Sequence, residues 1–382
     1  MENYTITVKT FAGLEEVLAR EVKLIGGKNI QSGRRAVTFN GDKKLLYKAN
    51  YNLRTALRVL KQLSTFRFRS VDDFYKKCRG TAWEDLMDVN QSFAVYSTVI
   101  NSGEFRNSMF ASLKVKDAIV DSFRAKTGSR PNVDTKDPEV AVHVHITGNQ
   151  CFLSLDSSGE SLHKRGYRVA QGTAPLSEVL AAGMILLSGW KGESDFIDPM
   201  CGSGTLPVEA ALIATNTPPG SFRKEFAFEN WIDYDAGLFN TVASETGKQD
   251  FSKKIYASDL LARNIGYAKA NARNAKIFNH ITFKVADFKD LTLRGNGATI
   301  MVNPPYGERL SQPGLDKLYA MIGERLKHQY PGNTAWILSA SKELLNNVGL
   351  KPASSVELYN GSLKCLFRNY ELFAGKRNTF SY

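Results

Sequence analysis

The sequence is poor in the residues that build disulfide scaffolds and structural metal sites. It contains four cysteines and five histidines in 382 residues, with no CxxC pair and no HxxxH spacing. Disulfide frameworks and zinc sites are therefore not expected. Apolar runs stay below the ~18 residues of a membrane span, and the first ten residues lack the charged start and apolar stretch of a signal peptide. These absences predict a cytoplasmic protein without a membrane partner and leave its oligomeric state open.

Positive charge, in contrast, is plentiful and concentrated near the N-terminus. The net charge is +12, and residues 1–79 hold 17 basic and 7 acidic side chains. The densest stretch interleaves Phe66, Phe68, Phe74 and Tyr75 with Arg54, Arg58, Lys61, Arg67, Arg69, Lys76, Lys77 and Arg79. Basic groups neutralise phosphates and exposed aromatic rings can stack on bases. The charge predicts a nucleic-acid partner, whereas each aromatic residue is more simply explained as core.

The first part of the chain has the pattern of two small α+β units, and the length predicts two or three domains. In the first unit, strands are expected at 4–8 and 36–39, and helices at 14–25 and 45–60. In the second, strands are expected at 93–100, 141–146 and 151–155, and a helix at 108–126. The polar run that follows, from His163 to Gly172, reads as a linker.

From Leu176 onward, helices alternate with short apolar strands, which is typical of a doubly wound parallel sheet. Strands are expected at 196–197, 255–257, 281–285, 299–302 and 335–338, and helices at 176–190, 204–214, 261–274 and 313–328. The alternation stops at a terminal β-hairpin over 356–373, with a type I′ turn at Asn360-Gly361. Such a hairpin is uncommon in nicotinamide-binding domains.

Two segments of this last part are candidates for ligand binding. At residues 196–205 a strand runs into a glycine turn and a helix start, where Gly202 and Gly204 let the backbone approach a nucleoside-like ligand and Asp198 ends the strand. Cys201 is interpreted as a packed small residue. Asp259 follows the second strand, where doubly wound folds bind a ribose, although it can equally cap the next helix. After the third strand, Asp287 could bond an adenine amine and Phe288 could pack on its ring.

The sharpest motif is Asn303-Pro304-Pro305-Tyr306 after an apolar strand. An exocyclic base amine is a poor nucleophile because its lone pair is delocalised into the ring. The Asn303 side-chain oxygen and the Pro304 carbonyl can each accept one N–H and aim the lone pair at an electrophilic methyl group. Pro305 fixes the Pro304 carbonyl, and Tyr306 supplies a face for an extruded base.

Taken together, residues 198–205 and 303–310 resemble the motifs of THUMP-domain methyltransferases that make N2-methylguanine in 23S rRNA. Residues 106–108, 114–121, 130–134, 162–168 and 174–178 extend the resemblance over nearly the whole chain. It implies an α/β protein with a ferredoxin-like domain at 1–65, a THUMP RNA-binding domain at 66–157, a linker at 158–175 and a class I, Rossmann-like methyltransferase domain at 176–382. Enterobacterial members carry a second methyltransferase unit, so a chain that stops at Tyr382 is expected to lack its guanine-N7 activity.

The resemblance also implies roles for individual residues. S-adenosylmethionine (SAM) would contact Pro175, Asp198, Met200, Cys201, Gly202, Gly204, Thr205 and Asn303, with Asp259 on its ribose and Asp287 and Phe288 on its adenine. Asn303, Pro304, Pro305 and Tyr306 would hold the target base. Structured RNA, either 23S rRNA or a ribosome-assembly intermediate, is the expected partner. The concentration of charge makes Arg67, Arg69, Lys76 and Lys77 candidate contacts, and further basic candidates are Arg106, Lys114, Lys164, Arg165 and Arg168. No metal is expected.

Four other interpretations stay open. The substrate could be a tRNA guanine, or an adenine N6 amine, because the Asn-Pro-Pro-Tyr motif recognises only a planar amine. A nicotinamide-dependent oxidoreductase would use the same fold, but Pro207 replaces the third glycine of GxGxxG. A catalytically inert RNA-binding protein would keep the RNA contacts alone.

Overall fold

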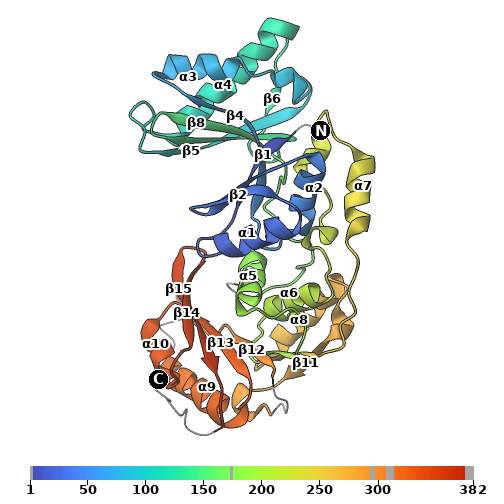
Figure 1. Cartoon of the computed structure of the whole chain (residues 1–382), viewed down its shortest axis with the longest axis vertical. Coiled ribbons are helices and arrows are strands. Elements are labelled where there is room, and N and C mark those ends of the chain that lie inside the picture. The colour runs from blue at the N-terminus through green and yellow to red at the C-terminus, as the bar shows by residue number, and fades with distance from the viewer. Residues whose placement is uncertain (1–2, 173–174, 293–296, 307–313, 375–382) are drawn as a thin grey trace. The chain divides into compact units, whose positions relative to one another are not determined.

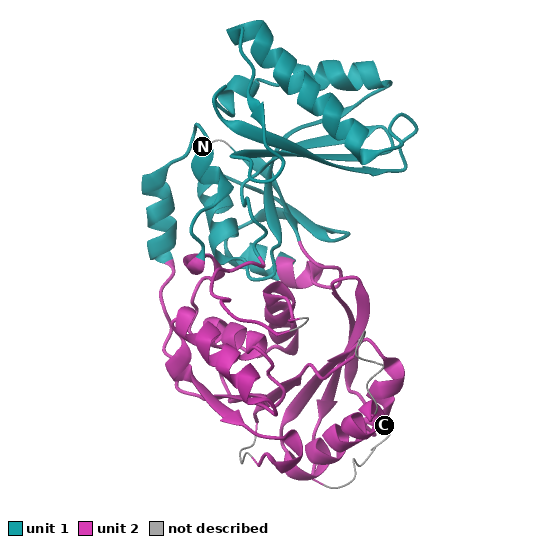
Figure 2. Cartoon of the chain, turned by 180° about the vertical axis from the view of Figure 1, so that it is seen from behind, with its two compact units in different colours: residues 1–9, 19–162, 223–245 teal, residues 10–18, 163–222, 246–382 magenta. Residues whose placement is uncertain are grey.

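The computed structural model describes residues 3–172, 175–292, 297–306 and 314–374. The chain divides into two compact units, coloured separately in Figure 2. Unit 1 comprises residues 1–9, 19–162 and 223–245, and unit 2 comprises residues 10–18, 163–222 and 246–382. Neither unit is one continuous stretch of sequence. Helix α1 (Glu15–Leu24) contributes residues to both.

Unit 1 is built on an eight-stranded sheet in the order β2-β3-β1-β4-β8-β7-β5-β6 (Figure 1). β5 pairs in parallel with β6 and β7, and the other neighbours are antiparallel. Its strands are β1 (Tyr4–Lys9), β2 (Lys28–Gly33), β3 (Ala36–Gly41), β4 (Arg58–Arg67), β5 (Ser92–Ile100), β6 (Asn132–Val133), β7 (Val140–Thr147) and β8 (Gln150–Asp156). Strand β4 pairs with β1 on one side and β8 on the other. The strands of both predicted N-terminal α+β units therefore belong to one sheet.

The helix predicted over 45–60 is wrong in its second half. Helix α2 (Lys43–Asn52) ends where Leu53 adopts an extended backbone, and β4 begins at Arg58. Val59 and Leu60 fit the helical spacing but are buried as strand residues, because β4 has hydrogen-bonding partners on both edges. Tertiary pairing has overridden the local pattern here.

The remaining helices of unit 1 have clear start and stop residues. α3 (Val71–Arg79) begins at Ser70, whose hydroxyl accepts from the Asp73 N–H, and α4 (Ser108–Thr127) begins at Asn107 and ends at the left-handed Gly128. A short 3-10 helix, η1 (Trp83–Asp85), follows α3. Phe68 and Phe74 are buried and pack against the ring of Phe105, so they are core residues.

Residues 223–245, which interrupt the methyltransferase-like part of the sequence, belong to unit 1. They contain η3 (Ala227–Asn230) and α7 (Ala236–Glu245). The ring of Phe228 stacks on Tyr47 of α2 at 4.3 Å, and Glu245 bonds Lys44 and Lys48 of the same helix. The insertion is thereby fixed onto α2 by both aromatic packing and ion pairs.

Unit 2 contains a seven-stranded sheet in the order β11-β10-β9-β12-β13-β15-β14. The five strands β11, β10, β9, β12 and β13 are parallel, whereas β15 is antiparallel to β13 and β14. The strands are β9 (Phe196–Asp198), β10 (Ile255–Asp259), β11 (Ile281–Val285), β12 (Thr299–Val302), β13 (Thr334–Ser339), β14 (Ser354–Asn360) and β15 (Leu363–Glu371). The doubly wound sheet and its antiparallel end were both predicted, and both are confirmed.

Helices cover both faces of this sheet, with α5, α6 and α8 on one face and α9 and α10 on the other (Figure 1). Their bounds are α5 (Glu178–Ser188), α6 (Thr205–Ala214), α8 (Ala262–Asn274), α9 (Leu315–Gln329) and α10 (Lys342–Asn347), with 3-10 helices η2 (Pro219–Phe222), η4 (Phe278–His280) and η5 (Phe288–Asp290). The core between β9, β12, β13 and α9 is apolar and includes Ile300, Tyr319 and Ile337.

The terminal hairpin turns one residue later than predicted. Asn360 still pairs with Leu363, so the two loop residues are Gly361 and Ser362. Of these, Gly361 alone has a positive φ, 64°. A type I′ turn needs positive φ at both central residues, so the turn follows the II′ pattern, with glycine first. The Asn-Gly pair predicted the hairpin correctly, but it predicted the wrong loop residues and turn type.

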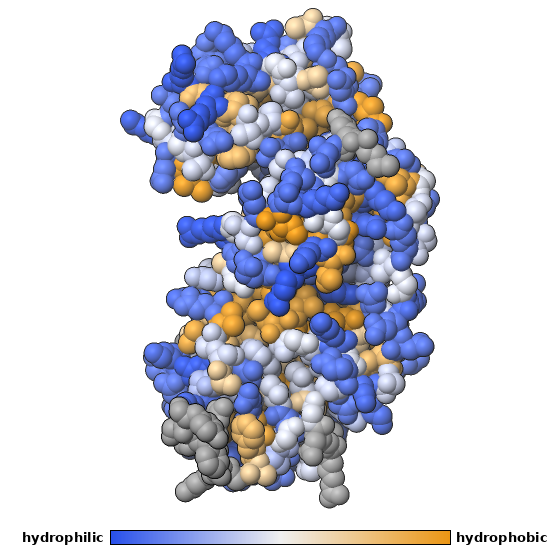
Figure 3. Space-filling view, viewed as in Figure 1, coloured by the Kyte–Doolittle hydropathy of each residue, from blue (hydrophilic) through white to orange (hydrophobic). Residues whose placement is uncertain are grey.

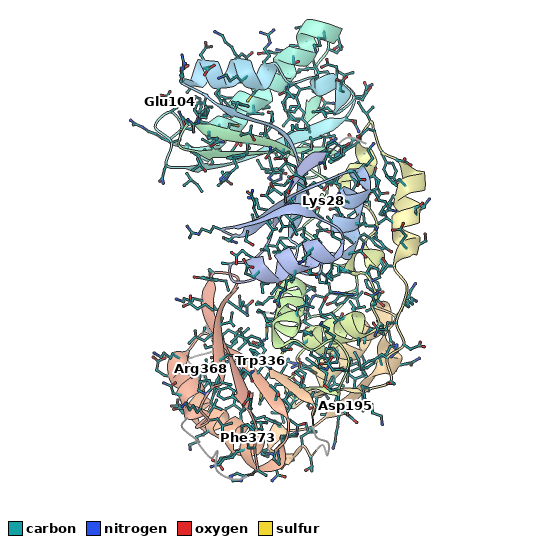
Figure 4. The ribbon with its side chains drawn as sticks, viewed as in Figure 1. Lys28, Glu104, Asp195, Trp336, Arg368 and Phe373 are labelled. Carbon is teal, nitrogen blue, oxygen red and sulfur yellow. The ribbon has the colours of Figure 1, made fainter. Side chains whose placement is uncertain are left out.

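The amino ends of the central strands are aligned by Asp195, which Figure 4 labels just before β9. Its side chain accepts from the Lys254 N–H at 2.9 Å and its carbonyl from the Thr299 N–H at 2.9 Å. β9 lies between β10 and β12, so the sheet changes winding direction at this strand. Ligands of open α/β sheets bind at the carboxyl ends of the strands beside such a switch point.

Candidate active site

The glycine turn after β9 is held by the carboxylate that ends β10. Asp259 Oδ2 accepts from the Gly202 N–H at 2.9 Å, and the Cys201 N–H donates to the Ser258 carbonyl at 2.8 Å. Gly202 has φ 54°, and a Cβ added there would meet no atom within 4 Å. The turn therefore presents open backbone at the switch point, as its sequence predicts.

Asp198 and Asp259 stand close together at this edge. Asp198 is 1% exposed and accepts from the Met200 N–H at 3.1 Å. Burial, reinforced by the Asp259 charge, holds the pKa of Asp198 well above its usual value. Asp259 Oδ1 accepts from the Leu261 N–H and from Asn264 Nδ2, each at 2.9 Å. The Asp259 carboxylate therefore bonds residues at the start of α8, but Leu261 is the N-cap residue of that helix and no side chain caps it, so the capping interpretation is wrong.

Two other residues of the turn, Gly204 and Thr205, are placed differently from the prediction, whereas Cys201 agrees with its interpretation as a packed residue. A Cβ at Gly204 would lie 2.8 Å from Ala268 Cβ, so this glycine permits close packing of α8 rather than approach of a ligand. The Thr205 hydroxyl accepts from Arg168 at 3.0 Å, which turns it toward the linker. Burial raises the pKa of Cys201 well above its usual value, which agrees with a packed residue and excludes a reactive thiolate.

After β11, the two residues predicted to contact adenine differ in their exposure. Asp287 accepts from the Lys289 N–H at 3.0 Å and keeps a partly exposed side chain. Phe288 is 2% exposed and packs in the apolar core, with its ring 5.9 Å from that of Tyr330. The prediction that Phe288 covers an adenine ring is wrong, because its faces are already used by the core.

The motif after β12 contains one of several buried polar atoms of unit 2 that lack a hydrogen-bond partner within its described residues. Asn303 Oδ1 is buried and has no hydrogen-bond partner among the residues that the structure describes. Pro304 beside it is buried, the Pro305 carbonyl accepts from the Tyr319 hydroxyl at 3.3 Å, and the Tyr306 hydroxyl accepts from Asn360 Nδ2 at 3.0 Å. A buried acceptor without a donor costs free energy, and a ligand with an N–H group at this place would supply the donor. The rest of this motif, residues 307–310, lies outside the described part of the chain.

The basic linker residues are not equally accessible. Lys164 is exposed, but Arg165 is 2% exposed and lies beside the buried Glu209. Arg168 pairs with Glu178 at 2.6 Å and has a side chain 14% exposed. The prediction that Arg165 and Arg168 contact RNA is therefore wrong for this conformation, because both guanidinium groups are used inside unit 2. Pro175 is half-buried, and Ala174 before it lies outside the described residues.

The predicted RNA contacts of unit 1 lie mostly on the surface. Arg67, Arg69, Lys76, Lys77 and Arg106 are exposed, and Lys114 lies over the half-exposed ring of Phe110. Figure 3 shows mainly hydrophilic surface where α3 and α4 lie, with smaller hydrophobic areas. Two further members of the basic stretch are internal, since Arg54 is buried and Arg58 pairs with the fully buried Asp156.

Sequence reasoning missed three residues that shape this site. Leu260 and Leu261 are 64% and 43% exposed directly after Asp259, which makes an apolar surface beside a carboxylate. Asn360 reaches Tyr306 from the hairpin. Adjacent leucines at the carboxyl end of a strand were a usable signal, whereas the contact of Asn360 depends on tertiary structure.

The donor and acceptor set fits a nucleoside cofactor with a charged, methyl-bearing sulfur. The open backbone at Gly202 would suit an amine group. The acidic Asp198 and Asp259 would suit a ribose, and the apolar Leu260 would suit a ring. Asn303 adds the unpartnered acceptor on the neighbouring strand β12.

Comparison with known proteins decides the family. A model of the RMKL-like methyltransferase domain matches residues 165–369, more than half of the chain. The chain belongs to this methyltransferase family. Models of the THUMP domain and of the RlmL ferredoxin-like domain match residues 68–156 and 5–60.

Solved structures similar to this RMKL-like methyltransferase span nearly its whole length. A possible methylase from Clostridium difficile 630 is 30% identical, with coverage of 99% of this chain and 100% of that one and a TM-score of 0.89. SMU.472, a methyltransferase by prediction and solved with SAH, is 29% identical (98% and 100% covered, TM-score 0.88). A predicted N6-adenine-specific DNA methylase from Listeria monocytogenes str. 4b F2365 is also 29% identical (97% of each chain, TM-score 0.88).

These findings confirm the expected family, fold and cofactor. The RMKL-like methyltransferases are SAM-dependent, and with its THUMP domain this one acts on nucleic acid. The oxidoreductase interpretation is thereby overturned. Within the described residues, every helix is too short or too polar to cross a membrane.

Proposed function

We propose that this methyltransferase transfers a methyl group from SAM to the exocyclic N2 of a guanine in 23S rRNA. The observation that carries the proposal is the buried, unpartnered Asn303 Oδ1 at the carboxyl end of β12. An aromatic amine supplies the donor that this oxygen lacks. A purely structural asparagine at the same place would be expected to have a partner.

The Asn-Pro-Pro-Tyr motif would activate the amine by geometry. Asn303 Oδ1 accepts one N–H of the amine and the Pro304 carbonyl accepts the other, which draws the nitrogen lone pair out of conjugation with the ring. Neither proline has an N–H to oppose the amine. The Tyr319 hydroxyl donates to the Pro305 carbonyl and so fixes Pro305. The extruded base would stack on the ring of Tyr306. Asn303 acts only as an acceptor: the N–CH3 bond forms as the S–CH3 bond of SAM breaks and SAH leaves, and the proton that the amine loses goes to water.

SAM would supply the electrophilic methyl group. The cofactor-holding residues are proposed to be Asp198 at the end of β9, Met200 and Gly202 of the turn, Asp259 at the end of β10 with Leu260 after it, Asp287 after β11, and Pro175 before α5. The similar SMU.472 was solved with SAH, the demethylated product of SAM, which supports a site of this kind. Asp259 Oδ2 accepts one N–H, from Gly202, so this oxygen keeps a lone pair that can accept from a ribose hydroxyl.

RNA is the proposed substrate because of unit 1. The THUMP and RlmL ferredoxin-like matches and the exposed Arg67, Arg69, Lys76, Lys77, Arg106 and Lys114 support an RNA-docking surface. Lys164, which is exposed in unit 2, is proposed as a separate RNA contact. The competing proposal is adenine N6 in DNA, which is the description of the similar Listeria protein. Two oxygen acceptors for an exocyclic amine do not by themselves distinguish guanine from adenine.

Mass spectrometry of nucleosides separates these substrates. We would compare 23S rRNA, tRNA and DNA from a wild-type strain, a deletion strain, and the deletion strain complemented with Asn303→Ala. The proposal expects one N2-methylguanine to disappear from 23S rRNA on deletion and to stay absent with Asn303→Ala. Loss of N6-methyladenine from DNA, or of N2-methylguanine from tRNA alone, would contradict it. Unchanged nucleosides in every pool would support an inert RNA-binding protein.

A further inference from the structure

The side chain of Arg168 joins the linker to both helix starts beside the glycine turn. Its Nε donates to Glu178 Oε1 at 2.6 Å, and one terminal nitrogen donates to the Leu176 carbonyl at 3.1 Å. Its other contacts are with the turn itself, at 3.2 Å to Ser203 Oγ and 3.0 Å to Thr205 Oγ1. One guanidinium thus binds the start of α5 and the start of α6 at once.

The chemistry of this contact requires an arginine. The four acceptors lie around a single planar group with five N–H donors, and a lysine ammonium on a flexible stem cannot reproduce that fork. Glu178 is 4% exposed, so its carboxylate needs a fixed partner. Arg168 therefore neutralises a buried charge while it holds the two hydroxyl groups of the turn.

A second side chain fixes the linker backbone at the same point. Asn271 of α8 is 1% exposed, and its Oδ1 accepts from the N–H groups of Val169 and Ala170 at 2.9 and 3.1 Å. Its Nδ2 donates to the Ala170 carbonyl at 2.8 Å and to the Ser203 carbonyl at 2.9 Å. Ser203 is therefore held through its side chain by Arg168 and through its carbonyl by Asn271.

We propose that Arg168 is a positioning residue that holds the glycine turn in its cofactor-binding conformation. The inference rests on the proposed cofactor site at residues 198–205. Arg168 contacts neither Asn303 nor the rest of the base-holding motif in the described structure. Its loss should therefore weaken binding of the cofactor and leave the transfer step itself nearly unchanged.

The test compares Arg168→Ala and Arg168→Lys with the wild-type enzyme. SAH affinity is measured by calorimetry, KM for SAM and kcat are measured with rRNA, and the Tm shows whether each variant folds. Arg273→Ala, which removes an exposed arginine of α8, is the matched control. We expect Arg168→Ala to weaken SAH binding and raise KM for SAM by at least tenfold, with kcat at saturating SAM within threefold of wild type. Methylguanidinium should restore part of the affinity of Arg168→Ala, and Arg168→Lys should recover little.

Several outcomes would overturn the inference. SAH affinity equal to wild type in Arg168→Ala would do so, as would a proportional fall in Tm, affinity and kcat that methylguanidinium does not reverse. If Arg168→Ala does not fold, Ser203→Ala with Thr205→Val removes the two acceptors and should reproduce the KM effect; an unchanged KM there would count against the inference. A wild-type protein that binds no SAH would instead refute the proposed cofactor site.

Discussion

Asn360, the last paired residue of β14, donates its side-chain N–H to the Tyr306 hydroxyl at 3.0 Å. The terminal hairpin thereby reaches the motif that follows β12, 54 residues earlier in the chain. Tyr306 is 9% exposed, and burial raises the pKa of its hydroxyl above the usual value, so the group stays protonated. The orientation of the Tyr306 ring is therefore coupled to the hairpin.

Asn360→Ala and Tyr306→Phe should have similar, non-additive effects on catalysis. Each removes the same hydrogen bond, of about 1 kcal/mol, and should reduce kcat roughly fivefold. Because the shared contact is already lost in either single variant, the double variant should be little worse than each alone. Steady-state kinetics of the four proteins gives the coupling, and strictly multiplicative losses would contradict the proposed contact.

Asn303→Ala should lower activity without lowering stability. The buried Oδ1 has no partner, so its removal relieves a desolvation cost and should leave the Tm unchanged or higher. Loss of one preorganised contact to the reacting amine should reduce kcat on the order of 100-fold, with SAH affinity nearly unchanged.

Asn333 is the matched control for this prediction. Its Oδ1 accepts from the buried Ala298 N–H at 2.8 Å, so Asn333→Ala should cost about 1–3 kcal/mol of stability and spare kcat. A large Tm loss in Asn303→Ala, with activity lost in proportion, would indicate that Asn303 is structural.

Asp198→Asn should stabilise the protein at neutral pH while it weakens cofactor binding. The pKa of Asp198 is raised in the folded state, so its protonated form is favoured there. Well below pH 4, an unfolded-state aspartate, with a pKa of about 3.9, is protonated as well, and the residue carries no penalty. As the pH rises, the unfolded chain ionises first and the wild-type protein loses stability that asparagine retains.

Thermal melts at several pH values check this prediction. The Tm difference between Asp198→Asn and wild type should be small near pH 4 and grow toward pH 8. Asp290→Asn, an exposed substitution, should leave the Tm nearly unchanged throughout. A difference that is constant with pH, or wild-type SAH affinity in Asp198→Asn, would refute the assignment of this carboxyl.

Arg67 and Arg69 should contribute more to RNA binding than Lys76 and Lys77. Both lysines form ion pairs one helical turn away, with Asp72 at 2.7 Å and Asp73 at 3.1 Å, which reduce the field that they offer to phosphate. Replacement of both arginines by alanine should flatten the slope of log K against log salt by up to about 2, and replacement of both lysines by less. RNA binding measured from low to high salt gives both slopes. Equal slopes in the wild type and both variants would show that RNA binds to another surface of the protein.

Much of the fold could be predicted because local patterns agreed with tertiary structure. Apolar runs ending at Asp198, Asp259 and Asn303 marked three neighbouring strands of the parallel sheet, and their carboxyl ends carry the candidate site. The helix predicted through Val59 was wrong because pairing on both edges of β4 decided that segment. No local signal carries that information.

The site was predictable in outline but not in the orientation of its side chains. Arg168 and Phe288 have residue types that suit RNA and adenine, yet the structure uses them inside unit 2. Residue type and position along a strand identify which segments reach the site. Which side chains remain available depends on packing against segments distant in sequence, such as Asn360 against Tyr306.

The most direct test of the central claim is a crystal structure of this methyltransferase with SAH. The account predicts SAH across the carboxyl ends of β9 and β10, with its sulfur facing the Asn303 side chain and its ribose beside Asp259. SAH bound with the sulfur turned away from Asn303, or in another part of the protein, would contradict the account.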